Sequence, residues 1–238
     1  MTDKVVGVIG GMGPEATVDL MMRVIRATPA EDDIDHIRMF VDNNPKIPSR
    51  IKAIIEGTGE SPAPSMTEMA RNLAASGADF LVIPCNTAHY YYDEVCRAVD
   101  IPVMNMIDVT VETVLKENAS IRIVGLLASK AVLMTGLYMK PFKRKGVDVI
   151  YPSPEVQELL MASVRKIKTG KYDSGDREVL RSAAEELVGK GVEALIVACT
   201  ELSIICDGLD AGVKVYDSSQ VLAEGIVRMA KGRGFDGL

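Results

Sequence analysis

The sequence has few of the residues that metal centres and disulfide frameworks require. It holds two histidines, His36 and His89, and four cysteines, with no Cys-x-x-Cys pair. Two histidines leave a zinc site without a convincing ligand set. Four cysteines in 238 residues are too few for a disulfide framework. We therefore expect no metal site, and either thiol chemistry or no chemistry at the cysteines.

Long apolar runs and blocks of positive charge are also absent. The net charge is −6, and the densest positive run is the three residues 143–145, which argues against a nucleic-acid partner. The first apolar run, Val5 to Ile9, is too short for a signal-peptide core, and no stretch approaches the length of a membrane span. We expect an ordinary soluble protein located in the cytoplasm, with neither nucleic acid nor membrane as a partner.

The glycine-rich segment 10–15 does not match a dinucleotide fingerprint. It reads Gly-Gly-Met-Gly-Pro-Glu, and Pro14 falls where the helix would have to offer a backbone N–H to a phosphate. A tight turn whose backbone amides approach a small carboxylate is a better interpretation. We therefore expect no nicotinamide or flavin cofactor.

Two stretches of the chain are copies of one another. Residues 77–87 align without gaps against 191–201 at a constant offset of 114, and each stretch places a cysteine, Cys85 or Cys199, after a short apolar run. Such a run after a glycine predicts a buried strand. Two further pairs of segments match at similar offsets: 6–10 with 124–128 at 118, and 101–103 with 213–215 at 112.

Apolar strands alternate with helical patterns along the chain, which favours parallel sheets covered on both faces. The expected strands are residues 4–9, 36–41, one ending at 84, 103–105, 121–128, 147–150, one ending at 198, and 213–216. The expected helices are residues 15–27, one ending near 76, one ending near 97, one between 128 and 147, 154–168, 176–190 and 218–231.

These elements predict an α/β protein with two pseudo-symmetric, doubly wound domains. Each domain has a mainly parallel sheet flanked by helices, and we expect the active site in the interdomain cleft. The predicted first domain is 1–103 plus 214–238, and the second is 104–213. In this division the last strand and the last helix both pack onto the first domain.

The two strand-end cysteines are the strongest candidates for chemistry. A single buried cysteine is usually a small hydrophobe, but a symmetric pair, each followed by polar residues at a helix start, favours function. A helix N-terminus lowers the pKa of a thiol, and the thiolate is the reactive form. Asn86, Thr87 and Thr200 offer side-chain donors to a carboxylate at the same helix starts.

The remaining cysteines and His89 are interpreted as structural. Cys96 and Cys206 lie inside or just past the following helices. His89 lies about one helical turn after Cys85 and could share its face, but a packed or hydrogen-bonded histidine is favoured over a catalytic one.

Three segments of the chain resemble the aspartate/glutamate racemase family. They are 9–17 (Ile-Gly-Gly-Met-Gly-Pro-Glu-Ala-Thr), 84–89 (Pro-Cys-Asn-Thr-Ala-His) and 198–202 (Ala-Cys-Thr-Glu-Leu). Within the family the chain is most similar to the cofactor-independent aspartate racemases, since Gly11-Met12 stands where glutamate racemases have Asp-Ser. The resemblance spans essentially the whole chain and implies that no cofactor is needed.

The resemblance also implies roles for individual residues. Cys85 and Cys199 match the two catalytic cysteines, one a thiolate base and the other a thiol acid. Asn86, Thr87 and Thr200 match the residues that hold the α-carboxylate, and Arg50 and Lys168 match the cations for the side-chain carboxylate. The full set of implied substrate-binding residues is Met12, Arg50, Asn86, Thr87, Ser129, Lys168 and Thr200.

Two departures from the family pattern affect this assignment. Residues 128–132 read Ala-Ser-Lys-Ala-Val where the family usually has Ala-Thr-x-Gly-Thr. Ser129 keeps a hydroxyl, but Lys130 and the missing glycine put the range of substrates in doubt. The aspartate of the usual Pro-Asp-Arg is Ser49 here.

We therefore expect an isomerase that interconverts L- and D-aspartate by 1,1-proton transfer between two cysteines, without pyridoxal phosphate or metal. The expected ligand is a small dicarboxylic amino acid, aspartate and also glutamate, and dimers are common enough to predict a homodimer. The alternatives are a broad-specificity amino-acid racemase, another cysteine-dependent isomerase such as a maleate isomerase or hydantoin racemase, and a non-catalytic protein that binds a small acid.

Overall fold

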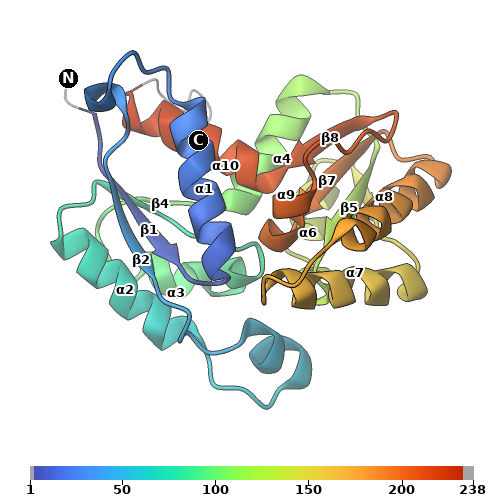
Figure 1. Ribbon diagram of the computed structural model, residues 1–238, viewed down its shortest axis with the longest axis horizontal. Helices are drawn as coiled ribbons and strands as arrows, with labels where there is room; N and C mark the ends of the chain where they lie inside the picture. The colour runs from blue at the N-terminus through green and yellow to red at the C-terminus, as the bar shows by residue number, and fades with distance from the viewer. Residues whose placement is uncertain (1–2, 233–238) are drawn as a thin grey trace. The chain divides into compact units, whose positions relative to one another are not determined.

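The computed structural model describes residues 3–232, which form two compact α/β units (Figure 1). One unit contains residues 3–109 and 219–232, and the other contains residues 110–218. Each unit has a four-stranded parallel sheet, with the strand order β2-β1-β3-β4 in the first and β6-β5-β7-β8 in the second. The predicted fold class, two parallel sheets flanked by helices, is confirmed.

The first unit places helices on both faces of its sheet. Its strands are β1 (Val6–Gly10), β2 (Met39–Asn43), β3 (Phe80–Val82) and β4 (Val103–Met104). Its helical elements are α1 (Pro14–Ala27), η1 (Asp33–Asp35), η2 (Lys52–Glu56), α2 (Ala63–Ala75), η3 (Thr87–Tyr91), α3 (Tyr92–Cys96) and all but the first residue of α10 (Ser218–Ala230). Helix α4 (Met106–Glu117) begins in this unit and continues in the second.

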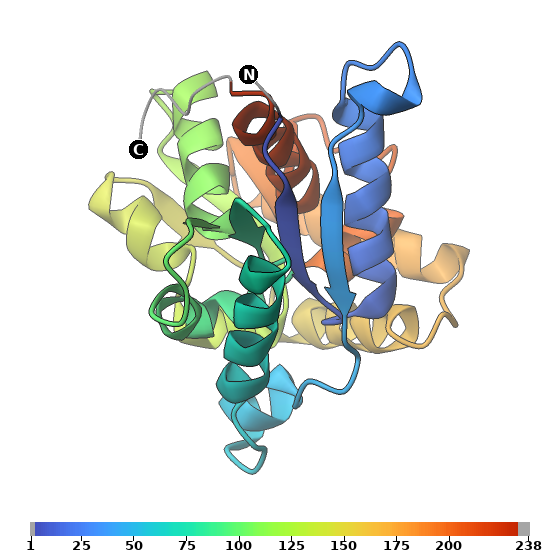
Figure 2. The ribbon, with the colours of Figure 1, turned by 90° about the vertical axis from the view of Figure 1, so that its left-hand side faces the viewer.

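Alternation along the strands of the first unit divides its core into two clusters. Val8 and Val82 pack with residues of α1 and α10, whereas Ile9 and Leu81 pack with residues of α2. Figure 2 shows α2 on one face of the sheet and α1 and α10 on the other. The sheet is thus buried on both faces, as the continuous apolar runs in the sequence require.

The second unit repeats this architecture. Its strands are β5 (Ile123–Ala128), β6 (Asp148–Ile150), β7 (Ala194–Ala198) and β8 (Lys214–Asp217). Its helices are α5 (Lys130–Thr135), α6 (Met139–Arg144), α7 (Pro154–Ile167), α8 (Ser174–Gly189) and α9 (Thr200–Ile205). Leu127 and Val197 pack against Leu160 of α7 and Leu187 of α8 in one continuous core.

The strand registers match the sequence repeat. Val6 pairs with Phe80 in the first sheet and Val124 pairs with Ala194 in the second, which reproduces the offsets of 118 and 114. The next pairs are Leu81 with Val103 and Leu195 with Val215, which reproduces 114 and 112. The three offsets found in the sequence therefore connect structurally equivalent strands.

Each sheet has one glycine at the point where a helix crosses it, Gly7 in β1 and Gly125 in β5. A Cβ atom on Gly7 would lie 2.5 Å from Leu81 Cδ2, and one on Gly125 would lie 2.7 Å from Leu195 Cδ2. Both distances are shorter than any normal carbon contact. The two units thus share a packing constraint as well as a strand order.

The prediction for the last strand was wrong. Strand β8 pairs in parallel with β7, so it belongs to the second sheet, and only helix α10 packs into the core of the first unit. The physical reason is the repeat itself: the 112 offset makes β8 the counterpart of β4, which pairs with β3 in the same register.

Several helical segments were missed or joined in the sequence prediction. Helix α4 was not predicted, although Asn105 caps it by accepting hydrogen bonds from the N–H groups of Ile107 and Asp108 at 2.9 and 3.3 Å. The single helix expected between β5 and β6 is two short helices, α5 and α6, because the backbone turns at Gly136 with φ of +65°. In the described residues no helix combines the length and apolar character that a membrane crossing needs.

Candidate active site

Each unit carries one cysteine at the carboxyl edge of its own sheet. Cys85 follows β3, and Cys199 follows β7 directly. Their exposed fractions are 6% and 4%. In both sheets the strand order reverses direction at this position, between β1 and β3 and between β5 and β7. Ligands of open α/β sheets bind outside the carboxyl ends of strands at such a switch point.

Met12 and Cys85 lie in the same apolar cluster of the first unit. Met12 is 1% exposed and shares this cluster with Ile47 and Tyr91. The turn that places Met12 needs a glycine before it, because Gly11 has φ of +92° and a Cβ there would lie 2.2 Å from the backbone of Asn44. The structure therefore brings the predicted Met12 and Cys85 together.

Asn86 and Thr87 follow Cys85 and are buried, with exposed fractions of 2% and 9%. The helix that they start is a 3-10 helix, η3, and it continues as α3 only from Tyr92. The prediction of a regular α-helix directly after Cys85 was therefore wrong, and both polar side chains lie in the tighter turn.

His89 holds the Cys85 segment in place. Its Nδ1 lies 2.9 Å from the carbonyl oxygen of Cys85, and its Nε2 accepts the N–H of Met106 at 3.0 Å. Since Nε2 is an acceptor, Nδ1 carries the proton and the ring is neutral. Burial lowers the pKa of His89 to about 4. His89 is structural, in agreement with the interpretation that the sequence favoured.

Arg50 lies at the start of the helical turn that leads into η2. Its side chain is half-buried, and Nη1 donates to the carbonyl oxygen of Pro48 at 3.2 Å. Burial raises the pKa of Tyr91, and the charge of Arg50 opposes this rise. Arg50 is thus close enough to act on Tyr91, which belongs to the Cys85 cluster.

Cys199 lies beside a charged pair in the second unit. Its thiol donates to Oε2 of Glu201 at 3.2 Å. Burial raises the pKa of the Cys199 thiol well above its usual value, and the negative charge of Glu201 raises it further. The backbone N–H of Leu202 and the charge of Lys168 act in the opposite direction. The helix start lowers the pKa of this thiol as expected, but burial and Glu201 outweigh it, so the expected net lowering of the pKa was wrong.

Lys168 forms an ion pair with Oε1 of the same Glu201. It comes directly after the last residue of α7, and its side chain is 30% exposed whereas that of Glu201 is 7% exposed. Sequence reasoning had not selected Glu201 as a site residue. Its signal was its place in Cys-Thr-Glu, two residues after Cys199.

The buried polar atoms that have no hydrogen-bond partner among the described residues include two near the carboxyl ends of β5 and β7. They are Oγ1 of Thr200 and Oε1 of Gln157. Gln157 Nε2 donates to the carbonyl oxygen of Ala128 at 2.9 Å, and Ala128 is the register partner of Ala198, two residues before Thr200. Gln157 was missed because nothing in its sequence context placed it at this edge.

In the altered segment after β5, Ser129 is buried at the strand end whereas the Lys130 side chain is exposed. Ser129 is 5% exposed and caps α5 by accepting the N–H of Val132 at 3.4 Å. The ammonium group of Lys130 instead pairs with Glu158 at 2.9 Å, with both side chains about half exposed. The hydroxyl therefore stays at the strand end, while the unusual cation extends into solvent.

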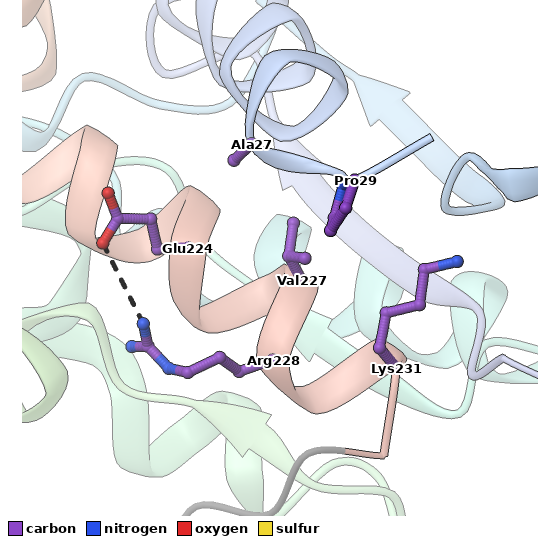
Figure 3. Close-up of a pocket in the computed structure, with 6 residues that line it drawn as sticks. All are labelled: Ala27, Pro29, Glu224, Val227, Arg228 and Lys231. Atoms are coloured by element: carbon purple, nitrogen blue, oxygen red, sulfur yellow. Dashed lines mark ion pairs between the residues drawn. The ribbon is translucent and has the colours of Figure 1, made fainter. Parts of the chain in front are cut away.

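A separate cavity of about 250 Å³ lies elsewhere in the first unit (Figure 3). It lies at the ends of α1 and α10, and Lys4 N donates to the carbonyl oxygen of Ala230 at the start of β1 nearby. This is the amino edge of the sheet, whereas Cys85 follows a carboxyl end. Its lining residues are Ala27, Pro29, Glu224, Val227, Arg228 and Lys231. Within residues 3–232 no cluster of three His, Cys, Asp or Glu side chains could hold a metal ion.

Comparisons with known proteins agree with the fold. The family model described as Asp/Glu/Hydantoin racemase matches residues 9–226. The solved structure of Picrophilus torridus aspartate racemase is similar, with 31% identity, a TM-score of 0.85, and coverage of 96% of this chain and 94% of that chain. An aspartate racemase homologue from Pyrococcus horikoshii OT3 shares 25% identity with a TM-score of 0.75, over 96% of this chain and 99% of that chain.

A curated relative has a wider substrate description. The "broad specificity amino-acid racemase RacX" of Bacillus subtilis (strain 168) is 26% identical over 93% of this chain and 96% of its own length. The chain belongs to the Asp/Glu/hydantoin racemase family, and the resemblance based on three motifs is confirmed. It is an isomerase, an amino-acid racemase of that family.

Proposed function

We propose that the protein is a cofactor-independent aspartate racemase in which Cys85 and Cys199 are the two proton-transfer groups. The observation that carries this proposal is the pair of buried cysteines after the equivalent strands β3 and β7. One of them, Cys199, contacts Glu201, which pairs with Lys168. The likeness to the Picrophilus torridus aspartate racemase supports the choice of substrate.

In the proposed reaction one cysteine, as a thiolate, removes the α-proton of aspartate. The electron pair of the broken C–H bond is left on the α-carbon, and the other cysteine, as a thiol, returns a proton from the opposite face. The reverse reaction exchanges the two roles, so a scaffold with two equivalent strand ends suits this chemistry. Each positioned proton-transfer group contributes about 10²–10⁴-fold to the rate of such a step.

The α-carboxylate needs strong stabilisation because negative charge develops next to it in the transition state. We assign this role to Asn86, Thr87 and Thr200, which follow the two cysteines and are all at least nine-tenths buried. The Thr200 hydroxyl supports the assignment because it has no partner among the described residues. A buried hydroxyl without a partner is unfavourable until a ligand supplies one.

We assign the side-chain carboxylate of the substrate to Arg50 and Lys168, and further contacts to Met12 and Ser129. Two cations select a dicarboxylic amino acid by charge pairing. Met12 supplies an apolar wall from the Cys85 cluster, and Ser129 offers its hydroxyl at the end of β5.

A broad-specificity amino-acid racemase is the second candidate. Two observations favour it: the match to the Bacillus subtilis enzyme over nearly the full length of both chains, and the altered segment 129–132. Turnover of both enantiomers of aspartate, glutamate, alanine and lysine would separate the two candidates. Activity confined to the dicarboxylic pair supports the roles of Arg50 and Lys168.

The test of the proposed function is incubation with L-aspartate in deuterated water. We expect the α-proton signal and the optical activity to disappear together. Cys85→Ala and Cys199→Ala should each lower the rate of racemisation by about 10²–10⁴-fold. Cys96→Ala, which changes a half-buried cysteine outside the site, is the matched control. Near-normal rates in both single variants would refute the two-thiol mechanism. Thermal stabilisation by aspartate without exchange would indicate a binding protein.

A further inference from the structure

One carboxylate in the second unit joins a thiol to an ammonium group. Oε2 of Glu201 accepts a hydrogen bond from the Cys199 thiol at 3.2 Å, and Oε1 forms an ion pair with Lys168. Glu201 and Cys199 are both buried. A buried carboxylate is unfavourable unless it is paired and hydrogen-bonded, and these two contacts supply one partner of each kind.

We propose that Glu201 is a positioning residue that keeps Cys199 protonated in the resting enzyme, with Lys168 balancing the buried negative charge. The inference rests on the proposed function, since it names Cys199 as the cysteine that begins the reaction as the proton donor. In that step the S–H bond of Cys199 breaks, a C–H bond forms at the α-carbon, and the electron pair of the S–H bond stays on sulfur as a thiolate.

The electrostatics of the site agree with this geometry. The groups that act on Cys199 are Glu201 on its own helix, Lys168 at the end of α7, and the backbone N–H of Leu202. Burial and Glu201 raise the pKa of the thiol, and these two effects outweigh the opposing pair. A thiolate at this position would put a second negative charge beside Glu201, which is unfavourable where both groups are buried.

The same contact links the protonation of Cys199 to the class of substrate. Lys168 is the proposed partner of the substrate's side-chain carboxylate, so a dicarboxylic substrate competes with Glu201 for its charge. When Lys168 pairs with the substrate, its positive charge no longer balances the negative charge of Glu201. The Cys199 thiolate then becomes less favourable, and the thiol keeps its proton. A dicarboxylic amino acid thus keeps Cys199 in the form that donates a proton, which a neutral side chain cannot do.

The experiment measures how fast iodoacetamide alkylates Cys199 as a function of pH, with peptide mass mapping to isolate this cysteine. Iodoacetamide reacts with the thiolate, so the midpoint of the pH profile reports the protonation of Cys199. In Glu201→Gln the profile should move to lower pH, and the rate at pH 7 should rise about tenfold for each unit that the pKa falls. Glu185→Gln, an exposed glutamate on α8, is the matched control and should leave the profile unchanged.

A second variant gives the opposite sign. Lys168→Gln removes the positive charge that opposes Glu201, so the profile should move to higher pH and the rate at pH 7 should fall about threefold or more. If circular dichroism shows that Glu201→Gln does not fold, the alkylation profile of Lys168→Gln alone tests the proposal. An unchanged profile in Lys168→Gln, or in a folded Glu201→Gln, overturns the proposal. Shifts of the expected signs in a protein that exchanges no α-proton of aspartate would instead overturn the proposed substrate.

Discussion

The surroundings of Cys85 and Cys199 differ although the strands that carry them are equivalent. Cys85 lies in an apolar cluster with Met12 and Tyr91, and a neutral histidine holds its carbonyl group. Cys199 contacts a carboxylate that is itself paired with a lysine. The comparison shows that a repeated scaffold places two thiols at equivalent strand ends, while the side chains that surround each thiol differ.

The strongest test of this comparison is to remove one thiol at a time. We expect Cys85→Ala and Cys199→Ala each to lower the rate of racemisation by about 10²–10⁴-fold, because each variant lacks one of the two proton-transfer groups. The remaining cysteine can still exchange the α-proton on its own face. Each variant should therefore exchange deuterium into a different enantiomer of aspartate, as measured by NMR. Residual exchange into the same enantiomer in both variants would show that the two thiols do not act from opposite faces.

The contribution of His89 to stability should appear as a dependence on pH. Its pKa falls from 6.5 to about 4 in the folded state because the ring is buried. Below pH 6.5 the unfolded chain binds a proton that the folded chain does not, so the free energy of unfolding falls as the pH drops from 6.5 to 4. The loss over this window is about 3 kcal/mol. Urea unfolding of the wild type and of His89→Gln isolates this slope, with His36→Gln as the control. Equal slopes in wild type and His89→Gln would contradict the assignment.

The paired glycines test how similar the two scaffolds are. Gly7→Ala and Gly125→Ala would each force a Cβ against a leucine of the neighbouring strand, Leu81 or Leu195. Overpacking of this kind lowers the free energy of unfolding by about 1–3 kcal/mol. We expect similar losses in the two variants by urea unfolding. A large loss in only one variant would mean that the two sheets do not pack against their helices in the same way.

The smallest effect is expected at the unusual cation after β5. Lys130 forms an exposed ion pair with Glu158, and such pairs contribute little to stability because solvent screens them. Lys130→Ala should therefore leave both the free energy of unfolding and the rate with aspartate close to those of the wild type. A large fall in that rate would indicate that Lys130 is part of the site.

Most of the scaffold could be predicted from the sequence because buried parallel strands leave continuous apolar runs. The copied segments also located both cysteines at strand ends. Strand β8 was placed in the wrong sheet because its sequence match to β4 was taken to mean that both strands belong to the first sheet. The match instead shows that β8 has the same position in the second sheet as β4 has in the first. Helix α4 was missed, although Asn105 gives its start a capping signal.

The site was less predictable because its chemistry depends on contacts between side chains. A helix start alone predicts a lowered pKa for Cys199, but the buried thiol also contacts Glu201, and the pKa is raised. Gln157 reaches the end of β5 from α7, a contact between residues 29 positions apart that no local pattern reveals. Sequence patterns thus identified the thiols, while their electrostatic partners required the fold.

Helix α10 has a consequence for the order in which the chain can fold during synthesis. Leu222 and Ile226 pack in the same cluster as Val8 and Val82. One face of the first sheet therefore stays uncovered until α10, which is synthesised more than a hundred residues later, packs onto it. The 110–218 unit, whose residues are contiguous, can complete its interior sooner. A chain truncated after β8 and released from the ribosome should thus show protease resistance in its later half while its beginning is still cut.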